Sequence, residues 1–203
     1  MNVIALTRPA LFKDPELALG MHRLLQRVSK DRLDWTVSVS DRLEAEQHNN
    51  LSPIYLSGVD RQDVVGCFRL LPTTGRNMVE DTFPILLDGI WESSRFCVDT
   101  TNVEATAQNG LREATFLLFA AMIERDQQHD LQAIATVTDL RMERILCRAG
   151  WGLDRVGEPR QIGTTKAIAG LLPVTDNALG AIRTAGKISK RIIETPASRA
   201  FAA

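Results

Sequence analysis

The order of strand-like and helix-like segments constrains the fold of this chain more than any other feature. Two apolar segments, Ile54–Gly58 and Val64–Leu71, are joined by five residues and predict a pair of neighbouring strands. A third strand is predicted over Ser94–Val98, followed by a long helix over Val103–Asp130 and a buried strand over Leu131–Val137. Because a hairpin precedes alternating helices and strands, the pattern favours an α/β fold with a mixed sheet covered by helices on both faces.

Residues typical of helix ends predict two further helices. Asp14 at the N-cap and Pro15 in the first turn begin an amphipathic helix that ends near Lys30. Asp139 begins a shorter helix, and Gly150 lies just beyond its end as a C-cap. The remaining predicted elements are two strands and a helix-capable tail, over Val3–Leu6, Ala167–Val174 and Asn177–Glu194.

The composition is that of one globular domain. The 203 residues include 44% hydrophobic and 24% charged side chains, and a net charge of −1 gives no overall attraction to nucleic acid or membrane. The widely spaced Cys67, Cys97 and Cys147 form no CxxC pair and predict buried, reduced thiols. The N-terminal apolar run is too short for a signal peptide, and no run reaches the roughly 18 residues of a membrane span. We therefore expect a soluble, cytoplasmic protein with no nucleic-acid or membrane partner.

Several common catalytic motifs are absent from the sequence. It contains no phosphate-binding loop, no dinucleotide-binding GxGxxG and no GxSxG nucleophile turn. His22, His48 and His129 are scattered and none has metal-ligand spacing, so no metal site is expected. An active site in this chain would therefore depend on carboxylates, guanidinium groups and backbone amides.

Two blocks of sequence carry a family resemblance. The first runs over Gly66–Gly75 as GCFRLLPTTG and continues over Trp91–Asp99 as WESSRFCVD. The second begins at Arg141–Leu146 as RMERIL and continues through Arg148, Gly150 and Trp151 to Gly157–Pro159. Together with the N-terminal stretches MHR and RLDW, these blocks resemble the LuxI-type acyl-homoserine-lactone synthases, from about Met21 to Val174.

The resemblance implies a fold, a reaction and a domain plan. It implies a GNAT-like α/β fold, with a mixed, mostly antiparallel twisted sheet, helices on both faces and a V-shaped cleft. It implies an acyltransferase that moves an acyl chain from acyl-acyl carrier protein to the amine of S-adenosylmethionine, followed by lactonisation to a quorum-sensing signal. S-adenosylmethionine would be a substrate, and no cofactor is expected. We expect one domain over residues 1–203, with residues 1–52 as a partly mobile acceptor-side region and 195–203 as a frayed tail.

The matched positions provide candidate site residues. An amine nucleophile must lose a proton, so Glu92 is the candidate general base. Ser94 and the backbone amides near Phe96 are candidates for polarising the thioester carbonyl. Arg69 and Arg95 are candidates for binding substrate carboxylates, since a guanidinium grips a carboxylate in bidentate fashion. For Glu92, Arg69 and Arg95, structural ion pairing is the alternative interpretation.

Further candidates concern the two substrates and the partner protein. Trp35 and Glu46 are candidates for the acceptor site. The acyl chain is predicted to lie along Phe116, Phe119 and Ile123, for which an ordinary helix-core role is the alternative. Three arginines at helical spacing form a candidate docking face for an acidic carrier protein, with a solvated helix face as the alternative: Arg141, Arg144 and Arg148.

The sequence departs from the family pattern on the acceptor side only. Leu25 and Ser29 stand where the family has an arginine and a phenylalanine, and Glu46 and Asn49 stand where it has two aspartates. Three hypotheses therefore remain open at the sequence level. The chain is a synthase with a remodelled acceptor site, an N-acyltransferase that uses a different amine, or a catalytically silent homologue that binds an acyl ligand or a carrier protein.

Overall fold

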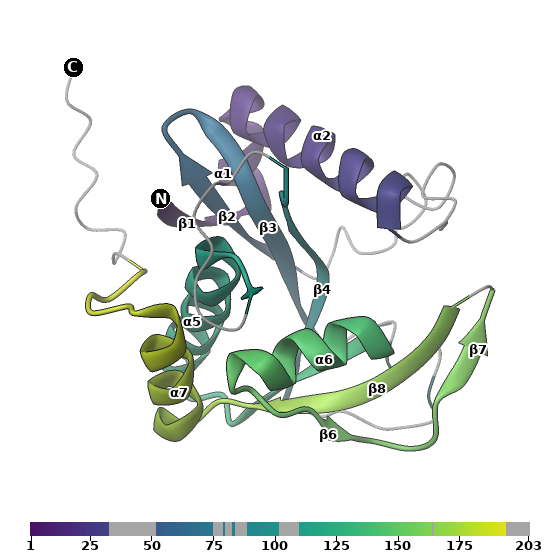
Figure 1. Cartoon of the computed structure of the whole chain (residues 1–203). Helices are drawn as coiled ribbons and strands as arrows, with labels where there is room; N and C mark the ends of the chain where they lie inside the picture. The colour runs from purple at the N-terminus through teal and green to yellow at the C-terminus, as the bar shows by residue number, and fades with distance from the viewer. Residues whose placement is uncertain are drawn as a thin grey trace.

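A computed structural model describes residues 1–32, 52–74, 79, 83, 89–101, 110–163 and 165–193, without the side chains of residues 29–32 (Figure 1). The helices are α1 (Arg8–Phe12), α2 (Pro15–Arg32), α5 (Glu113–Gln127), α6 (Leu140–Ala149) and α7 (Asp176–Gly186). The strands are β1 (Asn2–Thr7), β2 (Ile54–Asp60), β3 (Asp63–Pro72), β4 (Trp91–Val98), β5 (Ala133–Asp139), β6 (Asp154–Arg155), β7 (Arg160–Ile162) and β8 (Thr165–Pro173).

The strands form one mixed sheet with two arms. The order is β1-β2-β3-β4-β5-β8-β6, with β7 also paired to β8, and every pair is antiparallel except β4 with β5. That parallel pair covers only three positions, from Trp91 opposite Ile134 to Ser93 opposite Thr136. The Thr136 hydroxyl donates to the Ser93 carbonyl at 3.1 Å at the last paired position. Beyond it the two strands diverge, and the arms separate as a V (Figure 1).

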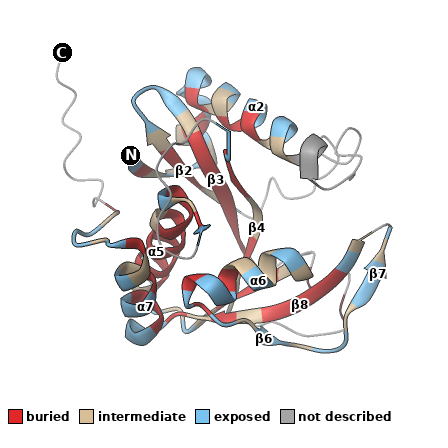
Figure 2. Ribbon diagram, in the orientation of Figure 1, coloured by how far each residue is buried: buried red, intermediate tan, exposed pale blue. Residues whose placement is uncertain are grey.

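Helices cover both faces of the sheet. On β3, Phe68 and Leu70 point into the core made with α5, α6 and α7, whereas Cys67 points into a second core made with α2. This alternation follows from the two-residue period of a strand, and it leaves β3 buried on both sides (Figure 2). The predicted α/β fold, mostly antiparallel with helices on both faces, is confirmed.

The predicted helix ends are observed. The Asp14 carboxylate accepts from the backbone N–H of Leu17 at 3.0 Å, and Pro15 begins α2. The Asp139 carboxylate accepts from the N–H of Met142 at 2.6 Å, and Gly150 ends α6 in the left-handed region at φ 86°. These predictions hold because caps depend on residues that are neighbours in sequence.

Several boundaries differ from the prediction. The predicted helix over Val103–Asp130 is not one element, because Gly110 has φ 68° and Arg112 is extended. The described helix runs from Glu113 to Gln127, and residues 103–109 lie outside the described residues. Strand β4 starts three residues before Ser94, at Trp91. The tail helix stops at Gly186, where Lys187 is left-handed, and α1 was not predicted. Cys147 is exposed on α6, so the prediction of three buried thiols is wrong at that position, whereas Cys67 and Cys97 are buried.

Candidate active site

Arg69, Glu92 and Ser94 lie on one face of the sheet, the face covered by α2. Arg69 of β3 is directly opposite Ser94 of β4, and its Nε donates to the Ser94 hydroxyl at 3.1 Å. Glu92 is two residues before Ser94, so both side chains leave the strand on the same side, about 7 Å apart along it. The structure thus brings together three of the residues predicted from the sequence.

The Glu92 carboxylate is buried at the start of β4. Its exposed fraction is 1%, and Oε2 accepts from the backbone N–H of Val79 at 3.1 Å. Glu92 pairs with Ala135 across the parallel junction and with Leu71 on the other side. A carboxylate at this position lies at the base of the V, next to the point where β4 and β5 separate.

Strand β4 carries a bulge at the centre of the candidate site. Cys67 pairs with Cys97 and Arg69 pairs with Ser94, so one residue of β3 is opposite both Arg95 and Phe96. Arg95 adopts the left-handed conformation at φ 57°, which is uncommon for a residue other than glycine. A bulge leaves an extra residue outside the regular ladder and redirects the strand. The predicted donors near Phe96 therefore lie where the backbone departs from regular pairing.

Aromatic side chains line the opposite face, which is covered by α5. Phe96 stacks on Phe119 with ring centroids 4.9 Å apart and on Phe68 at 6.2 Å, and Phe119 meets the edge of Trp151 at 5.5 Å. All three predicted acyl-chain residues, Phe116, Phe119 and Ile123, belong to this buried core. Phe116 is also buried but points towards α7, where a Cβ added at Gly186 would lie 2.6 Å from the Phe116 Cβ.

The predicted docking arginines are all exposed on α6. Arg141, Arg144 and Arg148 lie at the solvent-facing side of the helix. Glu143 of the same helix pairs with Arg155 of β6, and its carboxylate accepts from the Arg155 Nε and Nη2 at 2.5 and 2.6 Å. This pairing lowers the pKa of Glu143.

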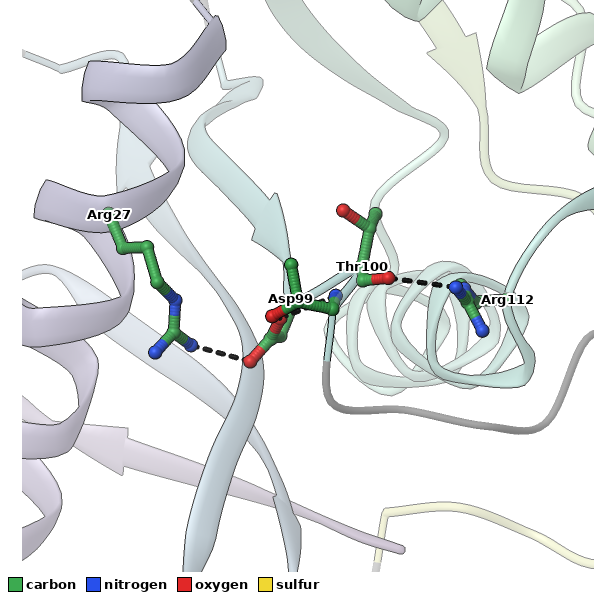
Figure 3. Close-up of polar contacts among 5 residues, drawn as sticks. Arg27, Asp99, Thr100 and Arg112 are labelled. Carbon is green, nitrogen blue, oxygen red and sulfur yellow. Dashed lines mark hydrogen bonds and ion pairs between the residues drawn. The ribbon is translucent and has the colours of Figure 1, made fainter.

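A polar cluster at the exit of β4 was not predicted as part of the site. Arg27 of α2 donates to Asp99 at 2.5 Å, and the other Asp99 oxygen accepts from the N–H and hydroxyl of Thr101 at 2.8 and 2.7 Å (Figure 3). Arg112 at the N-terminus of α5 donates to the Thr100 carbonyl at 2.8 Å. The sequence signal was the aspartate that ends the WESSRFCVD block. Trp35, Glu46 and Asn49 lie outside the described residues.

A second unpredicted cluster lies at the start of β4. The Arg125 guanidinium lies 4.0 Å from the centre of the Trp91 ring and forms an ion pair with Asp126. Asp126 is fully buried, and one of its oxygens, Oδ2, has no hydrogen-bond partner among the described residues. Burial raises the pKa of Asp126 to about 6, although the Arg125 charge opposes this shift.

Within the described residues, no three His, Cys, Asp or Glu side chains are grouped as metal ligands would be. No helix there is long and apolar enough to cross a membrane.

A V-shaped mixed sheet, a bulged strand and a buried carboxylate at the base of the V are features of the GNAT-like fold. The model of the autoinducer synthase family matches residues 11–182. A probable acyl-homoserine-lactone synthase of Sinorhizobium fredii is 42% identical over 201 residues, covering 95% of this chain and 97% of the relative. An acyl-homoserine-lactone synthase of Agrobacterium fabrum is 44% identical over 191 residues, covering 90% of each chain.

Solved structures agree with the sequence relatives. The fold matches BjaI, a CoA-dependent acyl-homoserine lactone synthase solved with MTA, with a TM-score of 0.77, 20% identity and coverage of 95% of this chain and 92% of that one. The chain therefore belongs to the autoinducer synthase family. It is an acyltransferase of the acyl-homoserine-lactone synthase type, which confirms the resemblance noted in the sequence.

Proposed function

We propose that this enzyme transfers an acyl chain from acyl-acyl carrier protein to the amine of S-adenosylmethionine and then closes the homoserine lactone. The observation that carries the proposal is the placement of Glu92, Ser94 and Arg69 together near the base of the V. This face of β4 is the one that α2 covers, and α2 leads into the residues that the family uses for the acceptor.

The first step forms an amide. The amine attacks the thioester carbonyl, the carbonyl carbon forms a bond to nitrogen, and the thiol of the donor leaves. Glu92 takes the proton that the amine loses, because it is a buried carboxylate on the same face of β4 as Ser94. Ser94 and the backbone amide of Phe96 stabilise the negative charge that develops on the carbonyl oxygen.

The second step closes the ring. The carboxylate of the acylated methionine attacks the carbon that bears its sulfonium group, forms the ester bond and expels methylthioadenosine. Arg69 and Arg95 orient the substrate carboxylate, since guanidinium groups bind carboxylates through paired hydrogen bonds. The fixed position of Arg69 against Ser94 supports this assignment for the first arginine.

The acyl chain extends away from the reacting carbonyl on the α5 face. Phe96 lies at the bulge on the α5 face, and its contact with Phe119 continues into an apolar core. We propose that Phe119 and Ile123 contact the acyl chain, whereas Phe116, which packs against α7, limits how far it extends.

The choice of donor depends on the α6 surface. Three exposed arginines on one helix suit a strongly acidic carrier protein, which supports acyl-carrier protein as the donor. The similarity in fold to the CoA-dependent BjaI keeps acyl-coenzyme A as the alternative.

Thiol release from matched donors tests the proposal. Octanoyl and longer-chain acyl groups are offered on carrier protein and on coenzyme A, each with and without S-adenosylmethionine. Thiol release that requires S-adenosylmethionine and is faster from the carrier protein supports both the acceptor and the donor assignment. Faster release from coenzyme A overturns the donor assignment, and release that needs a different amine overturns the acceptor assignment.

A further inference from the structure

Helix α2 crosses the sheet with one stripe of residues facing β3 and β4. Gly20, Leu24 and Arg27 follow one another at i, i+4 and i+7, so their side chains lie on one side of the helix. A Cβ at Gly20 would lie 2.8 Å from a methyl group of Val64 on β3, which shows how close the helix backbone comes to the sheet. Leu24 is 1% exposed. Arg27, one turn further, extends beyond the apolar contact to the end of β4.

The ion pair of Arg27 is asymmetric in its burial. The Arg27 side chain is 45% exposed, whereas the Asp99 side chain is only 3% exposed. A surface ion pair contributes little on its own, but a buried carboxylate that loses a cationic partner is costly. Asp99 is also fixed by its own N–H, which donates to the Val65 carbonyl at 2.8 Å. The sheet therefore fixes the position of the Asp99 carboxylate, and the Arg27 side chain extends from α2 to reach it.

The exit of β4 is held from both faces at once. Arg27 holds Asp99 from α2, and Arg112 holds the Thr100 carbonyl from the start of α5 (Figure 3). The strand that carries Glu92, Ser94 and the bulge is thus connected to the helix that leads into the acceptor-side residues. Leu25, at the position where the family has an arginine, packs instead in the apolar core beneath α2.

We infer that Arg27 is a positioning residue for the acceptor: through Asp99 it holds the C-terminal half of α2 against the end of β4 and so sets where S-adenosylmethionine binds relative to Glu92. This inference rests on the proposed function. Arg27 does not face the reacting atoms. Its effect is on the binding of the acceptor, and neither the acyl donor nor the chemical step depends on it.

Three variants of α2 test the inference in steady-state kinetics. Arg27→Ala raises the KM for S-adenosylmethionine about fivefold to tenfold, while kcat and the KM for the acyl donor stay within twofold. Arg27→Lys recovers most of the loss, because a lysine still supplies a point charge to Asp99. Arg23→Ala, an exposed arginine one turn earlier on the same helix, leaves both KM values unchanged. A rise in both KM values together, or equal behaviour of Arg27→Ala and Arg23→Ala, overturns the inference.

Amide hydrogen exchange of α2 provides a readout that needs no turnover. Exchange over residues 21–32 is faster in Arg27→Ala than in the wild type and in Arg23→Ala. Unchanged exchange in Arg27→Ala overturns the inference whatever the kinetics show. A second outcome separates this inference from the proposed function. The wild type could lack turnover with S-adenosylmethionine while added S-adenosylmethionine still slows amide exchange in α2, and only when Arg27 is present. That result would overturn the proposed reaction and support the positioning role.

Discussion

The two arms of the sheet place their charged residues differently. The first arm, β1 to β4, buries Arg69, Glu92 and Asp99 between the sheet and its covering segments. The second arm, β5 to β8, carries exposed arginines on α6 and an exposed ion pair between Arg155 and Glu143. Buried charges are held in one geometry by their partners, whereas exposed charges steer an approaching partner and are screened by salt.

This difference separates chemistry from recognition. Fixed groups are needed where a proton is transferred and a carbonyl is polarised, so changes in the first arm are expected to lower kcat. Exposed surface charges affect encounter with a partner, so changes on α6 are expected to alter kcat/KM and its salt dependence.

The largest effect is expected at Glu92. Glu92→Gln keeps an oxygen that can accept from the Val79 N–H but removes the base, so kcat for acyl transfer falls by a factor on the order of 10² to 10⁴. Thiol release and thermal unfolding are measured on the same preparation. Glu143→Gln in the second arm is the control, with kcat within about twofold of wild type. Equal kcat values for the two variants would remove the distinction between the arms.

The junction of the arms is predicted to respond to pH through Asp126. The pKa of the Asp126 carboxyl is raised from 3.8 to about 6 in the folded state. Between these two pH values the folded protein therefore keeps the carboxyl proton that the unfolded chain has lost. The carboxyl therefore favours folding below about pH 4, and this contribution is lost as the pH rises through 6. At about 1.4 kcal/mol for each pKa unit, the loss is on the order of 3 kcal/mol.

Asp126→Asn removes this titration. The difference in unfolding free energy between wild type and variant, measured in urea from pH 4 to pH 7, should therefore shift by a few kcal/mol in favour of the variant as the pH rises. A difference that stays constant over that range would mean that Asp126 is ionised throughout and that the Arg125 ion pair dominates.

A smaller effect is expected on α6. Reversing the charge at Arg144 and Arg148 should lower kcat/KM for an acyl-carrier-protein donor by about tenfold at low salt, chiefly through the association rate. The loss should shrink at high salt and be absent with an acyl-coenzyme A donor. Lys187→Glu with Lys190→Glu makes the same change in net charge away from α6 and is the matched control. Equal losses in both pairs would assign the effect to net charge and not to a docking face.

The smallest effect is expected at Ser94. Ser94→Ala removes the acceptor of the Arg69 hydrogen bond, a change of about 1 kcal/mol, and should lower kcat about fivefold with little change in thermal stability. Kinetics of Ser94→Ala and Ser94→Thr distinguish the roles, because threonine retains the hydroxyl. A fully active alanine variant would restrict the chemistry to Glu92 and the backbone amides.

Features that depend on neighbouring residues were predictable from the sequence, and those that depend on distant ones were not. The caps of α2 and α6 and the strands β2, β3, β5 and β8 follow from local residue types. The joint position of Arg69 and Ser94 followed only from the family resemblance, since 25 residues separate them. Other features arise only once the strands are paired in their final register. These are the bulge at Arg95, the contact of Val79 with Glu92, and the pairs Arg27–Asp99 and Arg125–Trp91. No periodicity in the sequence encodes those contacts.

The most direct test of the central claim is mass spectrometry of the product made from S-adenosylmethionine labelled in the carboxyl, Cα, Cβ and Cγ carbons of its methionine part. The account predicts an acyl-homoserine lactone that retains the label, with one unlabelled methylthioadenosine released per lactone, and loss of both products in Glu92→Gln. An acylated product without the label, or no methylthioadenosine from a preparation that consumes donor thioester, would contradict it.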